Sequence, residues 1–502
     1  MIKKILVANR GEIAVRVMRT CREMGIHSVA VFSDADRNAM HVRYADEAYH
    51  IGPSPSSESY LDIDKIIAAA KKSKADAIHP GYGFLSENAE FSKRCSKEGI
   101  KFIGPSADSI AAMGDKITAR RAITRAGVPI VPGTTDPLTS DEDALKVIKG
   151  IGLPVMIKAS AGGGGKGMRL VSNEKDIIPS LRAAKSEARA SFGNDAVYVE
   201  KYISSPHHIE FQILADQYGN VIHLFERECS VQRRHQKVIE ETPSPLLTSE
   251  IREEMGSHAV AVAKAASYEG AGTIEFIVDE NLNYFFLEMN TRLQVEHPIT
   301  ERVVGIDLVR EQINIANGFE LTYKQNEVTQ NGHAIECRIY AEDPDNNFIP
   351  SPGVIQHITE PLGFGVRHDG YVYEGYEIPM YYDPLISKLI IWGKTRDEAI
   401  ARMKRALFAY KITGVKTSIK FLERIMNTPD FVNGNYNTHF IEKNWKFLQD
   451  EDKCTGDCKA MAIIAAFIDY QNRIKEVKGK MNTKSSGSNW KSCNRKKSML
   501  RL

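Results

Sequence analysis

Apolar positions in the first hundred residues follow two different spacings. Short apolar runs have the length of buried strands at 4–8, 28–32 and 77–79. Residues 13–24 and 64–72 instead repeat their apolar positions at helical spacing. Strands and helices in regular succession are typical of a parallel sheet with helices on its faces. The pattern therefore predicts an α/β domain at the N-terminus.

Turn residues and polar groups are concentrated at 79–88, directly after the third of these strands. Open α/β sheets bind ligands at the carboxyl ends of their strands, so this segment is a candidate for ligand contact. A tight turn would explain the same glycines without any ligand. The sequence leaves both interpretations open.

A glycine-rich segment follows the apolar run 154–158. Residues 161–167 hold five glycines, and an alternating run at 168–171 comes directly after them. Glycine permits positive φ and exposes backbone N–H groups, which can surround an anionic oxygen. Lys158 and Lys166 add positive charge. The strand, loop and strand pattern predicts a flexible hairpin that binds phosphate.

Three alternatives to a phosphate-binding hairpin fit the glycines less well. Gly162, Gly164 and Gly167 have the spacing of a dinucleotide fingerprint, but that motif opens a helix. A P-loop needs Ser or Thr after Gly-Lys, and here Gly167 follows Lys166. A flexible linker would be rich in serine and would not lie between two strands.

Two apolar runs, 273–278 and 284–290, flank a polar turn and predict a β-hairpin. A hairpin centred on residues 281–282 places Glu275 directly across from Glu288. Opposed carboxylates about 5 Å apart repel each other unless a cation lies between them.

A divalent cation would remove this repulsion. Mg²⁺ prefers hard oxygen ligands and shares them with phosphates, so Glu275, Glu288 and Asn290 are expected to face the metal of a nucleoside triphosphate. The alternative is that both acids lie on a solvated face. Their aromatic and aliphatic neighbours disfavour it.

Two further segments, 230–237 and 290–298, are dense in charged and amide side chains but show no helical or strand periodicity. The second begins at the expected metal ligands, so Arg292 and Glu296 should lie just beyond the triphosphate. A base and a guanidinium there suit a small oxyanion that attacks the γ-phosphate. A surface charge network is the alternative interpretation.

Length and composition limit the class of protein. A chain of 502 residues predicts about two to four domains. A net charge of +2 gives no bias towards nucleic acid or membranes. The N-terminal apolar run is shorter than a signal sequence requires, and the run near 460–468 cannot span a bilayer. Seven cysteines, an odd number, fit free thiols in a reducing compartment. We therefore expect a cytoplasmic protein that binds neither nucleic acid nor membrane.

The composition changes near the C-terminus. Residues 458–477 place apolar side chains at helical spacing and predict one amphipathic helix, which either covers the core or docks a partner. After Gly479 the chain is basic and contains no acidic residue, as is typical of a disordered tail. RNA or membrane binding and assembly are less favoured alternatives for this tail. Cys454 and Cys458 lack the second pair that a zinc site needs.

Taken together, the motifs resemble those of biotin carboxylases of the ATP-grasp superfamily. The resemblance covers residues 1 to about 446 and is specific because of the order of its segments. These segments are 8–14, 79–83, 113–116, 161–167, 233–237, 288–292, 294–298 and 336–338.

The resemblance implies an α/β, ATP-grasp fold in several parts. An N-terminal Rossmann-like (pre-ATP-grasp) domain with a parallel sheet would span residues 1–110. The ATP-grasp domain would follow at 111–330, with a mobile glycine-loop lid at about 128–203. A C-terminal α+β domain would cover 331–446, followed by an extension at 447–502.

The resemblance also implies a reaction, the carboxylation of biotin by bicarbonate with ATP and Mg²⁺ or Mn²⁺, through carboxyphosphate. The residues expected to bind ATP are Lys116, Lys158, Gly164, Gly165, Lys166, Glu200, Lys201, Tyr202, Ile203, His208, Gln232, His235, Glu275 and Glu288. The metal would be held by Glu275, Glu288 and Asn290.

The same resemblance assigns the remaining site residues. Bicarbonate would bind to Lys237, Arg292, Gln294 and Val295. Glu296 would deprotonate it, and Tyr82 and Arg338 would contact biotin. The catalytic set would be Lys237, Arg292, Glu296 and Arg338, with Arg338 stabilising the enolate-like oxyanion of biotin.

The sequence lacks the Ala-Met-Lys-Met signature of biotin attachment. The expected partners are therefore a separate biotin carboxyl carrier protein and a carboxyltransferase subunit, together with a second copy in a homodimer. The carboxyltransferase would select the acceptor, which leaves acetyl-CoA, propionyl-CoA and pyruvate open.

Two alternatives remain for the function. One is another ATP-grasp carbon–nitrogen ligase, such as a carbamoyl phosphate synthetase or a purine carboxylase. The other is a non-catalytic nucleotide-sensing subunit, which the presence of Lys237, Arg292, Glu296 and Arg338 disfavours.

Overall fold

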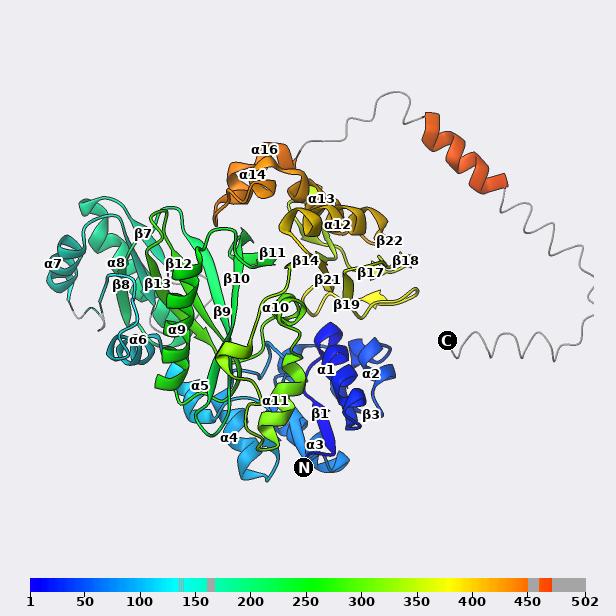
Figure 1. The fold of residues 1–502 in the computed structure, drawn as a ribbon, viewed down its shortest axis with the longest axis horizontal. Helices are drawn as coiled ribbons and strands as arrows, with labels where there is room; N and C mark the ends of the chain where they lie inside the picture. Colours follow the sequence, from blue (N-terminus) through cyan, green and yellow to red (C-terminus); the bar gives the residue numbers. More distant parts are fainter. Residues whose placement is uncertain (135, 137, 139, 160–167, 450–459, 472–502) are drawn as a thin grey trace, which may run out of the picture. The chain divides into compact units, whose positions relative to one another are not determined.

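The computed structural model describes residues 1–502 apart from 135, 137, 139, 160–167, 450–459 and 472–502 (Figure 1). The chain divides into two compact units, Met1–Leu448 and Gln449–Leu502. The first unit has the mixed α/β architecture predicted from the sequence.

The N-terminal sheet is parallel and has the strand order β3-β2-β1-β4-β5. Its strands are β1 (Lys4–Val7), β2 (His27–Ser33), β3 (Glu47–Gly52), β4 (Ala77–His79) and β5 (Lys101–Phe102). Its helices are α1 (Gly11–Glu23), α2 (Met40–Tyr44), α3 (Ile63–Ser73), α4 (Ala89–Lys97) and α5 (Ala107–Gly114). The predicted parallel sheet is confirmed, although α2 and β3 were not foreseen.

The strand order of this sheet reverses between β1 and β4, the position at which parallel sheets form ligand crevices. The turns that follow the two strands are joined there. Asn9 Nδ2 donates to the carbonyl oxygens of Pro80 and Tyr82, each at 2.7 Å. Gly81 has φ +64, and a Cβ at this position would lie 2.9 Å from Asn9 Nδ2. Glycine is therefore required for the two turns to approach each other.

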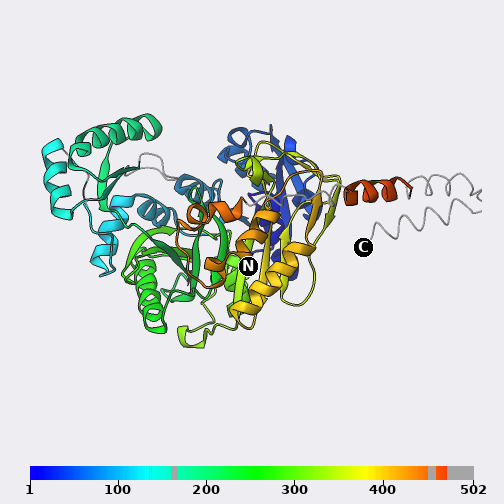
Figure 2. The same cartoon turned by 90° about the horizontal axis from the view of Figure 1, so that it is seen from above.

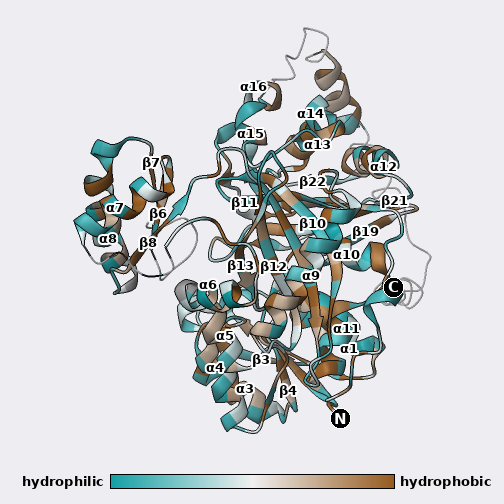
Figure 3. Cartoon of the chain, turned by 60° about the vertical axis from the view of Figure 1, so that its left-hand side comes forward, coloured by the Kyte–Doolittle hydropathy of each residue, from teal (hydrophilic) through white to brown (hydrophobic). Residues whose placement is uncertain are grey.

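A small lobe follows, with the antiparallel strand order β7-β6-β8 and its own hydrophobic core. It lies to one side of the large sheet in Figures 1 and 2. Its elements are α7 (Asp141–Ile151), β6 (Val155–Ala159), β7 (Arg169–Val171), α8 (Ile177–Phe192) and β8 (Val197–Lys201). Helix α6 (Lys116–Arg125) precedes the lobe, and its Ala119 and Ile123 pack in the core of the large sheet instead. Helices α7 and α8 carry both hydrophilic and hydrophobic residues (Figure 3). The antiparallel pairing of β6 with β7 confirms the predicted hairpin strands, while the glycines between them lie outside the described residues.

The largest sheet has the order β13-β12-β9-β10-β11-β14-β21-β19 and is antiparallel throughout. Its strands are β9 (His207–Ala215), β10 (Val221–Arg233), β11 (Gln236–Thr242), β12 (Gly270–Val278), β13 (Tyr284–Asn290), β14 (His333–Tyr340), β19 (Val366–Gly370) and β21 (Leu385–Gly393). The helices that pack on it include α9 (Ser249–Ala265), α10 (His297–Val304), α11 (Leu308–Ala316), α12 (Arg396–Ala409) and α13 (Ile419–Asn427).

Shorter elements complete the first unit. The strands are β15 (Glu342–Asp343), β16 (Ile349–Pro350), β17 (Gly353–Val354), β18 (His357–Thr359), β20 (Glu377–Ile378) and β22 (Lys411–Thr413). The last helices are α14 (Pro429–Val432), α15 (Phe440–Lys443) and α16 (Trp445–Leu448).

The β12–β13 hairpin has the predicted register at its open end. Glu275 pairs with Glu288, and Thr273 pairs with Asn290. Nearer the turn the register differs by one residue, because the pairing shifts to Phe276 with Phe286. Leu287 is the extra residue of this β-bulge, so the uninterrupted hairpin expected from the sequence is wrong in that detail.

Residues 230–237 also differ from expectation, because they belong to strands although no strand periodicity is visible in them. Ser230–Arg233 end β10, Gln236 begins β11, and Arg234 and His235 form the turn with φ +50 and +67. The pairing of these strands contains register shifts, which interrupt the alternation of the side chains.

The second unit contains a helix at residues 460–471. This confirms the central part of the helix predicted at 458–477, whereas Cys454 and Cys458 lie outside the described residues. Its apolar side chains are exposed and include Met461, Ile464, Phe467 and Ile468. None of the helices in the described part of the chain has the length and hydropathy needed to cross a membrane.

Candidate active site

A cavity of about 1410 Å³ is lined by residues from the N-terminal sheet, the small lobe and the large sheet. Most of the residues predicted from the sequence line it, namely Tyr82, Lys158, Glu200, Lys201, Tyr202, Ile203, His208, Gln232, His235, Lys237, Glu275, Glu288, Asn290, Arg292, Gln294, Val295 and Arg338. Glu296 is fully buried and contacts two of these side chains. Gly164, Gly165, Lys166 and the side chain of Lys116 lie outside the described part of the chain.

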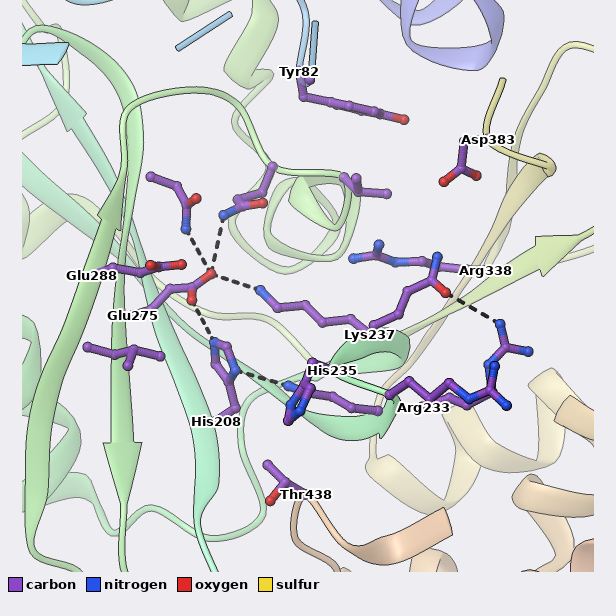
Figure 4. A pocket seen from close by; sticks show the side chains of 18 of the residues that line it. Tyr82, His208, Arg233, His235, Lys237, Glu275, Glu288, Arg338, Asp383 and Thr438 are labelled. Carbon is purple, nitrogen blue, oxygen red and sulfur yellow. Dashed lines mark hydrogen bonds and ion pairs between the residues drawn. The ribbon is translucent and has the colours of Figure 1, made fainter. Parts of the chain in front are cut away.

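The carboxylates of Glu275 and Glu288 lie side by side at the cavity wall (Figure 4). Glu275 Oε1 accepts a hydrogen bond from Asn290 Nδ2 at 2.8 Å, and Glu275 Oε2 lies 3.0 Å from His208 Nε2. His208 Nδ1 in turn lies 3.0 Å from Gln232 Nε2. The two carboxylates suit a hard divalent cation, and Asn290 would present its amide oxygen to the metal in place of the Nδ2 that now faces Glu275.

The cations around Glu275 favour its ionised form. Burial acts to raise its pKa, but Lys237 and His208 hold the pKa of Glu275 well below its usual range. Burial acts to lower the pKa of His208, and the charge of Glu275 overcomes this effect and raises it. Glu275 is therefore an anion that can accept a metal in exchange for its present cationic neighbours.

Lys237 lies between Glu275 and Glu296 and contacts both carboxylates. Its ammonium lies 3.1 Å from Glu275 Oε1 and 2.7 Å from Glu296 Oε1, and it also contacts Glu210. Burial acts to lower the pKa of Lys237, but these three carboxylates raise it well above its usual range. The side chain is therefore charged, and it is positioned for an anion between the metal pair and Glu296.

Arg338 lies on the other side of Glu296. Its guanidinium donates to Glu296 Oε2 at 2.9 Å and to Glu240 Oε1 at 2.6 Å. Burial would raise the pKa of Glu296, but Lys237, Arg338 and Arg227 hold it well below its usual range. Glu296 is therefore ionised and can accept a proton.

Arg292 is oriented by its neighbours in the predicted anion pocket. Its Nε donates to Glu87 Oε2 at 2.7 Å, and its Nη1 donates to Gln294 Oε1 at 2.9 Å. The carbonyl of Val295 accepts a hydrogen bond from Lys388 Nζ at 2.8 Å. These contacts place a guanidinium, an amide and an ordered backbone segment beside Glu296.

The small lobe contributes the other end of the cavity. Lys158 Nζ lies 2.5 Å from Glu200 Oε2, and Arg120 bonds to the other oxygen of the same carboxylate. Lys201 Nζ donates to the carbonyl oxygens of Gly152 and Leu153. β8 spans Val197–Lys201, so the strand predicted at 200–203 begins and ends earlier than expected, and residues 202–203 line the cavity just beyond it.

Tyr82 comes from the turn after β4, so the polar segment at 79–88 contributes to the lining of the cavity, while its contact with a ligand stays a prediction. Its hydroxyl bonds to Glu12, whose Oε1 also lies 3.3 Å from Lys388 Nζ. Phe84 and Gly83 line the same cavity, whereas His79 is buried and pairs with Gln312.

Several supporting residues were not found from the sequence, namely Glu12, Glu87, Arg120, Glu210, Arg227, Glu240 and Lys388. Glu210 and the fully buried Arg227 lie 2.5 Å apart beneath Lys237. Glu210 could have been found from the sequence, because His208, Glu210 and Gln212 alternate with apolar residues in β9. This alternation places three polar side chains on one face of the strand.

Comparison with known proteins identifies the family of the chain. The sequence matches the family models "Biotin carboxylase, N-terminal domain" over residues 1–110, "Carbamoyl-phosphate synthase L chain, ATP binding domain" over 115–324 and "Biotin carboxylase C-terminal domain" over 336–443. A subunit of pyruvate carboxylase from Methanothermobacter thermautotrophicus is 56% identical over 443 residues, which are 88% of this chain and 90% of the relative. Biotin carboxylase 1 of Bacillus subtilis is also 56% identical over 443 residues, which are 88% and 98% of the two chains.

Solved structures agree with these relatives. The β-γ-ATP complex of biotin carboxylase from Campylobacter jejuni has a TM-score of 0.86 at 51% identity and covers 88% of this chain and 99% of that one. The biotin carboxylase domain dimer of Hydrogenobacter thermophilus 2-oxoglutarate carboxylase, solved with MgADP, ADP and bicarbonate, has a TM-score of 0.86 at 49% identity and covers 90% and 100%. The fold and the cavity are those of an ATP-grasp ligase. Within that class, the chain belongs to the biotin carboxylase family.

Proposed function

We propose that this enzyme uses ATP and bicarbonate to carboxylate biotin carried on another protein. The observation that carries the proposal is one continuous set of contacts, from the paired acids Glu275 and Glu288 through Lys237 and Glu296 to Arg338. This arrangement supports the proposed roles of a metal-binding pair, an anion pocket, a base and a guanidinium, which follow one another in the order that the reaction requires.

The nucleotide would lie between the small lobe and the β12–β13 hairpin. Mg²⁺ or Mn²⁺ held by Glu275, Glu288 and Asn290 would neutralise charge on the triphosphate. Lys158, His208, Gln232 and His235, with residues 200–203, line the same space and would bind the rest of ATP, together with Lys116 and the glycine segment. The solved relatives in complex with β-γ-ATP or MgADP support the binding of a nucleotide by this chain.

Bicarbonate would bind among Lys237, Arg292, Gln294 and Val295. Its hydroxyl proton would pass to Glu296, and its oxygen would attack the γ-phosphorus as ADP leaves, which forms carboxyphosphate. Glu296 is held as an anion by Lys237 and Arg338. When bound bicarbonate draws Lys237 away from it, Glu296 becomes a stronger base.

Carboxyphosphate would then divide into CO₂ and phosphate. The phosphate would remove the N1′ proton of biotin, and N1′ would attack CO₂, while Arg338 stabilises the negative charge on the ureido oxygen. Tyr82 lines the same end of the cavity and would contact the biotin ring. Because carboxyphosphate is hydrolysed readily, the glycine segment is expected to close over the site.

The partners are proposed in the same way. A biotin carboxyl carrier protein and a carboxyltransferase subunit would complete the enzyme, since the relative from Methanothermobacter thermautotrophicus is itself named as one subunit of pyruvate carboxylase. The solved domain dimer supports a homodimer. The identity of the final acceptor and a cytoplasmic location stay predictions from the sequence.

The test is a comparison of ATP hydrolysis by the full chain with and without bicarbonate, free biotin, ammonia and a purine intermediate. Bicarbonate-dependent hydrolysis that biotin stimulates is the expected result, with incorporation of labelled carbon into biotin as the direct measure. Stimulation by ammonia or the purine instead would support the other ATP-grasp ligases. ATP binding without turnover would support the nucleotide-sensing alternative.

A further inference from the structure

Two buried acids behind Arg338 have no role in the mechanism above. Glu240 on β11 pairs directly with Glu336 on β14, and both side chains are 0% exposed. Directly opposed residues of an antiparallel pair point to the same face of the sheet, with their Cβ atoms about 5 Å apart. The two carboxyl groups therefore occupy one side of the sheet, the side that carries Arg338.

These two carboxyl groups lack the partners that buried charges need. Glu240 Oε1 accepts from Arg338 at 2.6 Å, but Glu240 Oε2 and both oxygens of Glu336 have no hydrogen-bond partner among the described residues. An ionised carboxylate buried without a partner costs several kcal/mol. A proton on Glu336 neutralises its carboxyl group. The protonated group can then donate a hydrogen bond to Glu240 Oε2, the oxygen that lacks a partner.

The surrounding charges assign the proton to Glu336. The charged groups that face the pair are Arg338 on β14, Lys388 on β21, Lys237 on β11 and Glu296 at the start of α10. Cys337, whose thiol pKa is raised by burial, lies on the opposite face of β14. Burial raises the pKa of Glu336 well above its usual range, and the charge of Glu240 adds to this effect. Burial also raises the pKa of Glu240, to about 7, although Arg338 opposes the shift.

Glu240 becomes more important for Arg338 during the reaction. Two anions hold the guanidinium at the outset, Glu240 at 2.6 Å and Glu296 at 2.9 Å. In the proposed mechanism Glu296 accepts the proton of bicarbonate and becomes neutral, so its bond to Arg338 weakens. Glu240 is then the anion that keeps the guanidinium in place while biotin reacts.

We propose that neutral Glu336 donates a hydrogen bond to ionised Glu240, and that Glu240 in turn holds Arg338 in position for carboxyl transfer to biotin. Both acids are positioning residues, since neither touches a reacting atom. This inference rests on the proposed function, and it adds two residues to the biotin half of the reaction.

The first experiment separates the two half-reactions in Glu240→Gln. Bicarbonate-dependent ATP hydrolysis without biotin is expected to change less than about threefold, whereas carboxylation of free biotin is expected to fall about tenfold or more. An equal loss of both activities would overturn the proposal, because it would indicate only a structural role. The wild-type chain is measured first. If the wild-type chain shows no biotin-dependent activity, the result contradicts the proposed function and not the role of Glu240.

The second experiment follows biotin carboxylation across pH. Wild-type activity is expected to rise as the pH passes through about 7, where Glu240 ionises, and this step should be absent from Glu240→Gln. Glu336→Gln keeps a neutral donor and should keep the step at the same pH. Glu336→Leu cannot donate, so the ionised form of Glu240 is less stable and the step should move to higher pH.

Two results would contradict the role of Glu336. A step that moves to lower pH in Glu336→Gln would show that Glu336 is normally ionised. Identical pH profiles in Glu336→Gln and Glu336→Leu would show that no hydrogen bond is donated. Thermal unfolding of each variant confirms the fold. If Glu336→Leu does not fold, Glu336→Gln alone tests the proposal. The rise in carboxylation then either stays at the wild-type pH, as expected, or moves to lower pH, which would contradict the role of Glu336.

Discussion

The ammonium of Lys237 lies 2.7 Å from Glu296 Oε1 and 3.1 Å from Glu275 Oε1, so one cation joins the proposed base to the proposed metal pair. Glu210 contacts the same ammonium from below. Three carboxylates share this cation, and any anionic substrate that approaches it must compete with them. In the proposed mechanism, the protonation of Glu296 is therefore coupled to the binding of bicarbonate.

Lys237→Gln should shift the pH dependence of bicarbonate-dependent ATP hydrolysis. The charge of Lys237 lowers the pKa of Glu296, so its removal raises that pKa, and the loss of activity on acidification should begin at a higher pH. The maximal rate should fall by about 100-fold, because the anion pocket also loses its cation. A pH–rate profile measures both effects. Lys237→Arg, which keeps the charge, is the matched control. If Lys237→Gln loses activity on acidification at the same pH as the wild type, the charge of Lys237 does not set the pKa of Glu296.

Glu288→Gln should abolish turnover of Mg-ATP and leave the fold intact. The substitution removes one of two opposed acids, so metal-dependent ATP binding weakens, with a loss of activity of about 100-fold or more. In the absence of metal, the thermal unfolding temperature should stay the same or rise, because the repulsion between Glu275 and Glu288 is relieved. Glu280→Gln, in the exposed turn of the same hairpin, is the control. Near-normal activity of Glu288→Gln would show that the pair does not hold the metal.

Arg338→Ala should retain part of the bicarbonate-dependent ATP hydrolysis and lose biotin carboxylation. Arg338 touches Glu296 through one bond only, whereas the biotin oxyanion would depend on the guanidinium directly. Arg338→Lys keeps the charge and should recover part of the carboxylation. The two rates are measured on the same preparation, and equal losses would place Arg338 in the first half-reaction as well.

Glu241→Gln should destabilise the first unit. Glu241 is buried and bonds to His333 at 2.5 Å and to Arg396 at 2.8 and 2.9 Å, as well as to Tyr436. Burial acts to raise the pKa of Glu241, but His333 and Arg396 lower it from 4.5 to about 2, which corresponds to about 3 kcal/mol of stability.

The stabilisation by Glu241 depends on pH, because folding lowers the pKa of its carboxyl group. The folded pKa lies below the unfolded one, so the stabilisation is complete above about pH 4.5 and is lost as the pH falls towards 2. Denaturant unfolding at pH 7 and pH 3 should therefore show a large difference between wild type and Glu241→Gln at pH 7 and a smaller one at pH 3. An equal difference at both pH values would mean that the charge of Glu241 contributes nothing.

Local patterns were sufficient for much of the fold. Strand β4 matches its predicted range, and Glu275 pairs with Glu288 as expected, because both predictions depend only on alternation and on a nearby turn. The bulge at Leu287 could not be foreseen. It depends on how β13 meets the rest of the sheet and the cavity, and an extra residue in an apolar strand leaves no mark in composition.

The supporting residues of the site were harder to predict for a related reason. Glu240 and Glu336 are more than ninety positions apart and meet only through the pairing of β11 with β14. Glu240 is followed by a second acid, Glu241, and Glu336 was noted only as part of the segment 336–338 that contains Arg338, so nothing in either strand indicates that the two acids meet. Glu87 likewise reaches Arg292 from the turn that follows β4, in the N-terminal domain. Contacts of this kind are set by the order of the strands, which a single sequence does not specify.

Leu287, the extra residue in β13, contributes to the cavity wall without setting the position of the two acids. Leu287 lines the cavity beside Glu288, yet the pairing on either side of it already places the two acids opposite each other. Deleting Leu287 would join the two registers and leave Glu275 facing Glu288, while an apolar wall residue would disappear. The wall of the cavity can therefore change at this position while the pair of acids stays where it is.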